Sequence, residues 1–346
     1  MTTMRYVVDI SPEMVDEILK HTKGGKYRTV QDFILTAVQN QLYVVERRSD
    51  SPDQESLKPA STVQADILHP HIDLLVIPTT RDVKTVDPPD GSKASDQLWG
   101  QFNRFFPVKV TMRVLANMLN ENGMACALKD VQEKAAMEAQ RIGQELERID
   151  DRMDRKRGDR LSTGLPFAKG RDEYKALTRF KMHFVGNPSK TKNGELKING
   201  APAVLRFVDI FEEGGSWKMG ITKMGLEFAW MSNPILEEGD YRGSSLFSDK
   251  ERDFLLEHIR QNLSSEADLI KSVLRWITDG ENTPRKLSAL VMGLDKEWSE
   301  NVAATMRAGL IGRLSELGVI ARSRDGVEVT YSLTSFGNDV LAKFDR

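Results

Sequence analysis

Residues 302–344 read VAATMRAGLIGRLSELGVIARSRDGVEVTYSLTSFGNDVLAKF, and this stretch decides the fold. Its first part has the periodicity of a helix over residues 302–317, with one apolar face formed by Met306, Leu310, Leu314 and Leu317. Gly318 ends that helix, as a glycine just past a helix end usually does. Two β-like runs follow at 319–322 and 327–333, and Arg324-Asp325-Gly326 between them is a turn signal. A last helix has its apolar side at Phe336, Val340, Leu341 and Phe344.

A shorter helix at 285–292 precedes this stretch, so the C-terminal order is helix, helix, two strands and helix. This order resembles the winged helix-turn-helix family. The most specific part of the resemblance runs from Glu316-Leu317-Gly318-Val319-Ile320 into Tyr331-Ser332-Leu333-Thr334-Ser335-Phe336-Gly337. The resemblance implies that the second helix enters the DNA major groove and that the wing grips the DNA backbone.

The side of helix 302–317 away from its apolar face carries the candidate base-reading residues Asn301, Thr305, Arg307 and Arg313. Asparagine and arginine can pair bidentately with adenine and guanine, respectively. On the wing, Arg322 and Arg324 would meet phosphate groups. The alternative is a winged helix that packs on a neighbour, with these arginines merely solvated.

A weaker second copy lies upstream. The run Ile221-Thr222-Lys223-Met224-Gly225, followed by Phe228-Ala229, repeats the order of Leu333-Thr334-Ser335-Phe336-Gly337, followed by Leu341-Ala342. An apolar β-like run over residues 200–211 and a glycine turn precede it. We therefore expect a second, degenerate winged helix in the middle of the chain.

Residues 174–184 would form the recognition helix of that second copy, and they lie in a basic window. The chain has 49 Lys and Arg against 51 Asp and Glu, a net charge of −2. Residues 169–197, however, hold eight basic and three acidic residues, a net charge of +5. Such a window can be an electrostatic footprint for nucleic acid or an ordinary solvated loop. The candidate DNA contacts are Arg171, Lys175 and Arg179 at the helix, and Lys190, Lys192 and Lys197 in a mobile basic loop over 187–200.

The first 45 residues carry a different pattern. A short strand over residues 4–10 leads into a helix that Ser11 can cap, and a second helix follows a glycine turn. This order is similar to the ribbon-helix-helix family, on the residues Val8-Asp9-Ile10-Ser11-Pro12-Glu13-Met14 and Tyr27-Arg28-Thr29-Val30-Gln31-Asp32-Phe33-Ile34. Members of that family pair their strands across a two-fold axis, because so small a unit cannot bury a core alone. The resemblance therefore implies a homodimer.

In the ribbon-helix-helix family the paired strands enter the major groove, where their outward residues read bases. Here those positions are Arg5, Val7 and Asp9. Arg5 suits guanine, whereas Asp9 would be repelled by phosphates unless it accepts a hydrogen bond from cytosine. Dimerisation without DNA reading is the alternative for this module.

Between the two ends, prolines and polar runs mark residues 46–95 as a linker, in which the apolar island 72–77 could dock as an added strand. Residues 96–235 are expected to be a helical domain that contains the second copy, with Trp99, Phe102, Phe105 and Phe106 in its core. Residues 130–156 predict a long helix whose apolar spacing suits packing on its own domain or on a partner chain. Two amphipathic helices open the C-terminal domain, 249–346.

The sequence contains no motif that points to catalysis. It lacks a Gly-x-x-x-x-Gly-Lys-Ser/Thr phosphate loop and a Gly-x-Ser-x-Gly nucleophile elbow. Its single cysteine, Cys126, excludes an internal disulfide and a four-cysteine zinc site, and no second ligand cluster accompanies His69 and His71. We expect no enzyme activity, no cofactor and no metal. Because no signal peptide or long apolar run is present, we also expect a cytoplasmic protein without membrane contact.

Together these patterns predict a mainly α protein with small β wings, built from a ribbon-helix-helix module and two winged-helix domains. They favour a dimeric protein that binds double-stranded DNA as a transcriptional regulator. The alternative is a non-enzymatic adaptor or scaffold, in which winged helices bind protein partners within a genome-defence or DNA-segregation complex. The near-neutral net charge and Asp9 favour the adaptor, whereas the basic window favours DNA.

Removal of residues 1–45 should convert a dimer into a folded monomer, because the later domains have apolar residues for cores of their own. Light scattering of the full-length and shortened proteins measures this. A shortened protein that is still dimeric would place the dimer contact on residues 130–156 or on another surface.

Overall fold

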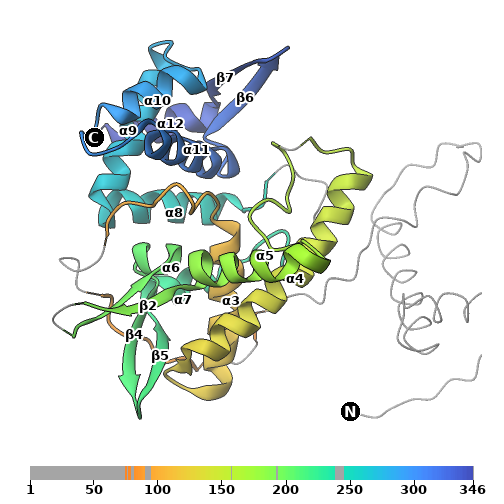
Figure 1. The fold of residues 1–346 in the computed structure, drawn as a ribbon, viewed down its shortest axis with the longest axis vertical. Coiled ribbons are helices and arrows are strands. Elements are labelled where there is room, and N and C mark those ends of the chain that lie inside the picture. The colour runs from red at the N-terminus through yellow and green to blue at the C-terminus, as the bar shows by residue number, and fades with distance from the viewer. Residues whose placement is uncertain are drawn as a thin grey trace, which may run out of the picture. The chain divides into compact units, whose positions relative to one another are not determined.

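A computed structural model of the 346-residue chain describes residues 75, 77–78, 82–89, 95–156, 158–191, 194–237 and 245–345. All of these residues belong to one compact unit, Leu68–Arg346. The ribbon-helix-helix module expected over residues 1–45 lies outside the described residues, as does most of the linker expected over 46–95. The described part is mainly helical with small antiparallel sheets, which confirms the predicted fold class at that level (Figure 1).

Two long helices open the described unit. Helix α3 (Phe106–Asn122) has a proline in its first turn, where the fixed φ of proline suits the helix. Strand β1 (Cys126–Ala127) connects it to helix α4 (Leu128–Arg152). The helix predicted over residues 130–156 is therefore present, but it starts and ends a few residues earlier than predicted. The apolar stripe of α4 is buried inside this same unit, at Ala135, Ala139, Ile142, Leu146 and Ile149. The stripe therefore packs on its own unit and does not need a partner chain.

The basic window forms a helix and a hairpin. After a short 3-10 turn (Gly170–Asp172), helix α5 (Glu173–Phe180) continues directly into a π-helical turn (Lys181–Val185). Strands β2 (Asn187–Lys190) and β3 (Leu196–Asn199) then pair antiparallel. The expectation of a mobile loop over 187–200 is wrong for its described residues, because the backbone amides and carbonyls of these strands pair with each other.

The apolar run expected as β structure over 200–211 also differs from the prediction. It begins with one helical turn, α6 (Ala201–Val204), in which Pro202 takes a first-turn position. Strand β4 (Val208–Glu213) starts only after that turn and pairs with β5 (Ser216–Ile221). β5 also pairs with β1, which gives a three-stranded sheet in the order β1-β5-β4, and helix α7 (Lys223–Trp230) follows.

The second half of the unit repeats this hairpin and helix. Its elements are α8 (Asp249–Asn262), α9 (Ser264–Thr278), α10 (Pro284–Met292), α11 (Glu300–Glu316), β6 (Ile320–Asp325), β7 (Glu328–Leu333) and α12 (Ser335–Phe344). A capping box of Ser248 and Glu251 starts α8, and hydroxyls of Thr283 and Ser299 start α10 and α11. β6 and β7 pair antiparallel (Figure 1).

Two threonines at equivalent places, Thr222 and Thr334, fix how each hairpin meets the helix after it. In each copy the hydroxyl accepts from the amide of the glycine three residues on, at 3.2 and 2.9 Å. It also donates to a carbonyl 16 residues back, at 2.8 and 2.7 Å. Phe228 follows Thr222 at the same distance along the chain as Val340 follows Thr334, and both apolar side chains are buried. Val340 is therefore the counterpart of Phe228, whereas the sequence comparison had paired Phe228 with Leu341. The hydrophobic-Thr-x-x-Gly repeat thus marks a hairpin-and-helix unit present twice.

The glycine of each repeat is required by a close approach of two backbones. A Cβ atom on Gly225 would lie 2.1 Å from the carbonyl oxygen of Phe207. A Cβ atom on Gly337 would lie 2.0 Å from the carbonyl oxygen of Val319. Both distances are far below van der Waals contact, so only glycine fits at these two positions.

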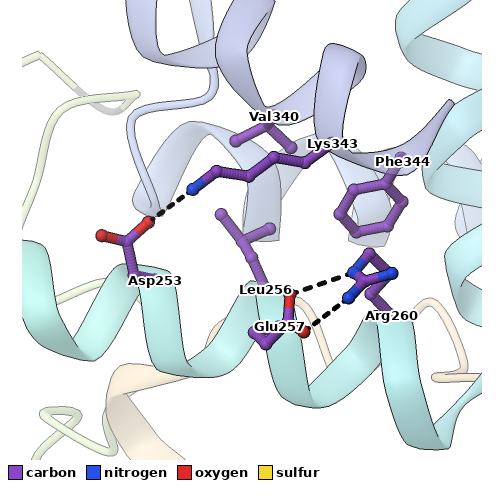
Figure 2. A pocket seen from close by; sticks show the side chains of 7 residues that line it. All are labelled: Asp253, Leu256, Glu257, Arg260, Val340, Lys343 and Phe344. Atoms are coloured by element: carbon purple, nitrogen blue, oxygen red, sulfur yellow. Dashed lines mark hydrogen bonds and ion pairs between the residues drawn. The ribbon is translucent and has the colours of Figure 1, made fainter. Parts of the chain in front are cut away.

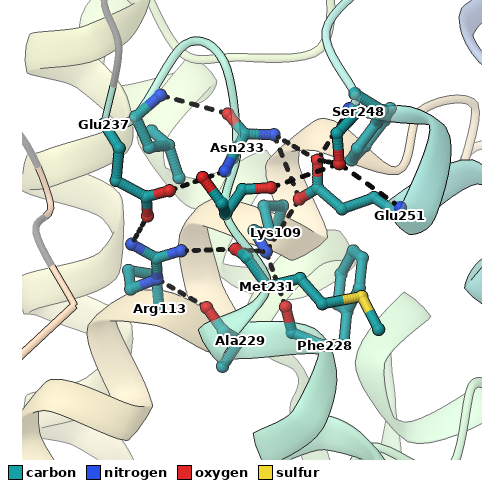
Figure 3. Close-up of polar contacts among 12 residues, drawn as sticks. Lys109, Arg113, Phe228, Ala229, Met231, Asn233, Glu237, Ser248 and Glu251 are labelled. Carbon is teal, nitrogen blue, oxygen red and sulfur yellow. Dashed lines mark hydrogen bonds and ion pairs between the residues drawn. The ribbon is translucent and has the colours of Figure 1, made fainter.

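A buried ionic network holds α3 against the end of α7 and the start of α8 (Figure 3). Lys109 pairs with Glu251 at 2.8 Å, and Arg113 pairs with Glu237. Burial lowers the pKa of Lys109 to about 8. Carbonyls at a helix C-terminus carry partial negative charge, so two cations are favourable there. The carbonyl oxygens that these cations contact belong to Phe228, Ala229 and Met231.

Gly337→Ala should lower the free energy of unfolding by about 1–3 kcal/mol, the usual cost of overpacking. The added methyl group would overlap the Val319 carbonyl oxygen, so the hairpin must separate from α12. Chemical denaturation of the full chain measures the change. Ser335→Ala, an exposed position on the same helix, is the control and should change stability by less than about 0.5 kcal/mol. Equal stabilities of the two variants would contradict the close approach.

Candidate nucleic-acid interface

Helix α5 presents a stripe of exposed basic and apolar side chains. Phe180 is buried and Leu177 packs on the core, so the helix has one inward side. Two side-chain contacts hold α5 and the turn after it to α4, between Gln140 and Glu173 at 2.7 Å and between Lys181 and Glu133 at 2.5 Å. Exposed residues of α5 and of the turns before and after it include Arg171, Tyr174, Lys175, Arg179 and Met182.

The cations of this stripe are largely free of acidic partners. Lys175 lies 3.5 Å from the exposed carboxylate of Asp172, a pair that solvent screens. Within the described residues, the side chains of Arg171 and Arg179 form no hydrogen bond or ion pair. Tyr174 between them is 78% exposed. The three predicted residues, Arg171 in the 3-10 turn and Lys175 and Arg179 on α5, are thus all exposed, as is the Tyr174 ring.

The β2–β3 hairpin contributes less positive charge than the sequence suggested. Lys190 pairs with Glu212 at 2.9 Å and lies 5.7 Å from the centre of the Trp217 ring. Lys197 is exposed, and Lys192 lies outside the described residues, as does Arg5. Because Glu212 already neutralises Lys190, Lys197 is the better candidate for a phosphate contact in this hairpin.

Helix α11 is packed against neighbouring segments on two of its faces, whereas the apolar spacing of residues 302–317 predicted one buried face. The segment that leads into α3, residues 98–106, lies against α11 at Met306, Gly309 and Gly312. Gly309 and Gly312 permit this contact: a Cβ on the first would lie 2.3 Å from the carbonyl oxygen of Gly100. A Cβ on the second would lie 2.8 Å from the carbonyl oxygen of Asn103. The 98–106 segment therefore occupies much of the surface that was expected to face DNA.

Arg313 is buried in this contact, so the prediction that it is available on the surface is wrong. Its guanidinium pairs with Glu266 at 2.6 Å and donates to the Phe102 carbonyl at 2.7 Å. Both charged side chains are almost completely buried. Glu266 lies in α9, far away in sequence, so the spacing of residues in α11 gave no sign of it.

The other predicted residues of the C-terminal half have mixed surroundings. Asn301 and Thr305 are exposed on the first turns of α11, although the Thr305 hydroxyl donates to the Asn301 carbonyl at 2.8 Å. Arg307 is half-buried and its Nε lies 3.2 Å from the Ser288 hydroxyl on α10. The wing residues Arg322 and Arg324 are both exposed on β6. Of the predicted residues described in this half, Asn301 and Thr305 on α11 and the two wing arginines are exposed.

The residues before α3 also bind the end of α11. The Glu316 carboxylate accepts from the amides of Phe105 and Phe106, at 2.5 and 3.2 Å, and so caps the start of α3.

Of the four aromatic residues expected in the core, Trp99 is 45% exposed and the other three are buried. Although Glu316 as a whole is half-buried, burial of its carboxylate raises the pKa to about 7.

A concave region between α8 and α12 is a weaker candidate site (Figure 2). Its volume is about 220 Å³, and its charged groups pair with one another. Lys343 lies 3.3 Å from Asp253, and Arg260 lies 2.6 Å from Glu257. Since these pairs satisfy one another, the region offers no unpaired group to a ligand.

No family model, curated protein or solved structure matches this chain. Across the residues that the structure describes, no cluster of three or more His, Cys, Asp or Glu side chains is arranged to hold a metal ion. In the same residues, every helix is too short or too polar to cross a bilayer. Function is therefore inferred from the geometry of the α5 face and its surroundings.

The stability of the wild-type protein should contain a component that falls as pH rises through the range of about 4.5 to 7. The folded protein holds a proton on Glu316 in this range, because its pKa is raised to about 7 from 4.5. By linkage, that proton stabilises the fold at the acidic end, by an amount on the order of 3 kcal/mol. Glu316→Gln should remove this component, which denaturation at several pH values measures.

Glu300→Gln, at an exposed position near the start of α11, is the matched control and should keep the pH dependence of the wild type. If Glu316→Gln and the wild type show parallel pH profiles, the Glu316 carboxylate does not titrate in this range.

Proposed function

We propose that the described region contains two winged-helix units and that the first of them binds double-stranded DNA with α5. Each half has the order helix, short extended segment, two helices, hairpin and helix. The first half uses α3, β1, α4, α5, β4–β5 and α7, with β2, β3 and α6 inserted. The second uses α9, the residue Asn282, α10, α11, β6–β7 and α12.

The extended segments support this proposal because they pair at matching places. Cys126 of β1 lies opposite Met219 of β5. The Asn282 carbonyl accepts from the Tyr331 amide at 2.9 Å, and Tyr331 is the counterpart of Met219 in the repeat. In winged-helix proteins the helix before the hairpin enters the major groove. By this alignment that helix is α5 in the first unit and α11 in the second.

The observation that carries the proposal is the free cationic stripe on α5. Arg171, in the turn before α5, and Arg179, on α5, are exposed and have no acidic partner among the described residues, and the ring of Tyr174 is exposed too. Unpaired guanidinium groups on an exposed helix can reach phosphates and guanine edges in a major groove. Lys197, on the hairpin after α5, would add a backbone contact. Helix α11 is the weaker reader, because the 98–106 segment covers it.

At the level of the whole chain, we propose a homodimeric transcriptional regulator. A two-fold pair of chains, joined through residues 1–45, would present two α5 helices and so read two half-sites. The exposed wing residues Arg322 and Arg324 and the first turns of α11 would supply further contacts.

One observation favours a second candidate function, that of an adaptor. Near the tip of the β4–β5 hairpin, Glu213 is exposed beside Glu212, which pairs with Lys190, and phosphates would be repelled by the Glu213 charge. In a non-enzymatic scaffold, this hairpin and the exposed part of α11 would bind a protein partner. The two functions predict different results when positive charges are removed from α5: DNA binding weakens if the protein is a regulator and does not change if it is an adaptor.

Changing Arg171 and Arg179 together to Ala should weaken duplex binding and flatten its dependence on salt. The logarithm of affinity against the logarithm of salt should lose about 0.9 of slope for each lost phosphate contact. Fluorescence anisotropy with genomic and random duplexes over a salt series measures this. An additional loss of preference for one sequence would show that an arginine also reads a base.

The matched control is Arg260→Ala, an exposed arginine on α8 that pairs with Glu257. It removes one positive charge without touching α5 and should leave the salt slope unchanged. If the double variant on α5 behaves like this control, α5 does not contact DNA. The adaptor function would then be the better explanation.

A further inference from the structure

An open groove runs along the end of α5, between the π-helical turn and residues 164–168. Its volume is about 350 Å³, near the lower end of the range of small-molecule sites, roughly 300–1,000 Å³. The walls are mainly apolar and aromatic, formed by Leu165, Pro166, Phe167, Phe180 and Phe184. A groove of this size and lining suits one planar ring and the groups attached to it, and no larger ligand.

Three polar side chains border the groove without satisfying one another. Asn103, Arg179 and His183 are among its lining residues. Within the described part of the chain, their side chains form no hydrogen bond or ion pair. An apolar pocket with a few unpaired polar groups around it is the usual composition of a binding site. The groove therefore offers an amide, an imidazole and a guanidinium to a ligand.

The imidazole of His183 is suited to a neutral ligand edge. Its ring contacts Phe102 edge-on, with 6.0 Å between the ring centres. Burial, with a smaller effect of the Arg179 charge, holds the pKa of His183 below its ordinary value. The neutral ring has one donor and one acceptor nitrogen, and the Asn103 amide has the same two capacities. This is the hydrogen-bonding complement of a nucleobase edge.

The backbone conformation beside the groove is also typical of a functional site. Residues 181–185 form a π-helical turn, a rare conformation that is frequent at functional sites. The turn carries both His183 and Phe184, so it supplies a polar and an aromatic part of the groove. Arg179, one turn earlier, belongs to the groove and to the cationic stripe of α5, so the two surfaces are continuous.

We propose that this groove takes up a single unpaired nucleobase, with the phosphate of the same nucleotide on Arg179. The apolar walls stack on the base, and Asn103 and His183 bind its edge. The inference rests on the proposed function in one respect, since Arg179 would serve both surfaces. The nucleotide has two sources, a free mononucleotide or an unpaired residue within a DNA strand, and the chemistry of recognition is the same for both.

The test uses the full-length protein and two probes. The first probe is AMP, titrated by isothermal calorimetry. The second is a duplex with one unpaired adenine, compared with the fully paired duplex of the same sequence. We expect AMP to bind, and the unpaired adenine to strengthen duplex binding about tenfold, the effect of one stacked base. AMP binding without a preference for the unpaired duplex assigns the groove to free nucleotides.

His183→Ala and Asn103→Ala should each abolish AMP binding and the preference for the unpaired adenine, while paired duplex binds as before. The two variants lie in different segments, one before α3 and one in the π-helical turn, so the test stays valid if one of them fails to fold. Met137→Ala, at an exposed position on α4 outside the groove, is the matched control and should behave as the wild type.

The inference is overturned if AMP does not bind and the two duplexes bind equally, or if the two groove variants behave as the control does. Paired-duplex binding without either groove effect leaves the proposed function standing alone. AMP binding that the groove variants abolish, without any duplex binding, leaves the groove standing and removes the proposed function.

Discussion

A buried ion pair within the second half, between Arg313 of α11 and Glu266 of α9, fixes the 98–106 segment of the first half against the second half. Removing two charges from water costs several kcal/mol, and hydrogen bonds must satisfy what the pair leaves unmet. The 98–106 segment supplies hydrogen bonds to both groups: its Leu98 amide donates to Glu266 at 3.0 Å, and its Phe102 carbonyl accepts from Arg313. If the segment left, the two charged groups would lose hydrogen bonds that offset the cost of their burial. The 98–106 segment therefore covers α11 because the buried charges of Arg313 and Glu266 need its hydrogen bonds.

Much of the local structure could be predicted from the sequence, because its causes are local. The apolar spacing in residues 130–156 and 302–317 gave helices close to α4 and α11. The hydrophobic-Thr-x-x-Gly repeat gave the hairpin-and-helix unit, since the hydroxyl cap and the backbone approach depend on those residues. The β2–β3 hairpin was missed, because β2 (Asn187–Lys190) lacks a strand-like alternation of polar and apolar residues and β3 (Leu196–Asn199) alternates over four residues only. The helical spacing of Tyr174 and Met182 with the three basic residues was in the sequence and could have been noticed.

The parts that could not be predicted depend on contacts between distant residues. The charges of Arg313, Lys109 and Arg113 look like ordinary surface charges in the sequence, and each is buried because a carboxylate or a helix end far along the chain receives it. A count of basic and acidic residues in the sequence therefore gives the wrong charge for the surface, because some of the counted charges are buried. Of the predicted cations, those on α5 are exposed because no such partner lies near them. The structure changes the order of the candidate DNA contacts: α5 comes first, and α11 second.

The threonine at the foot of each hairpin has a consequence for the length of the chain. Its hydroxyl bonds a carbonyl 16 residues back, so both ends of the hairpin are tied at one point and the following helix starts from that point. Extra residues at the tip lengthen a loop whose ends are already closed, at a small entropic cost. The same insertion next to Thr222 or Thr334 would separate the hydroxyl from its carbonyl. The two tips, at Gly214-Gly215 and Gly326-Val327, are thus the places where a peptide tag or a fluorescent label can enter without moving α7 or α12.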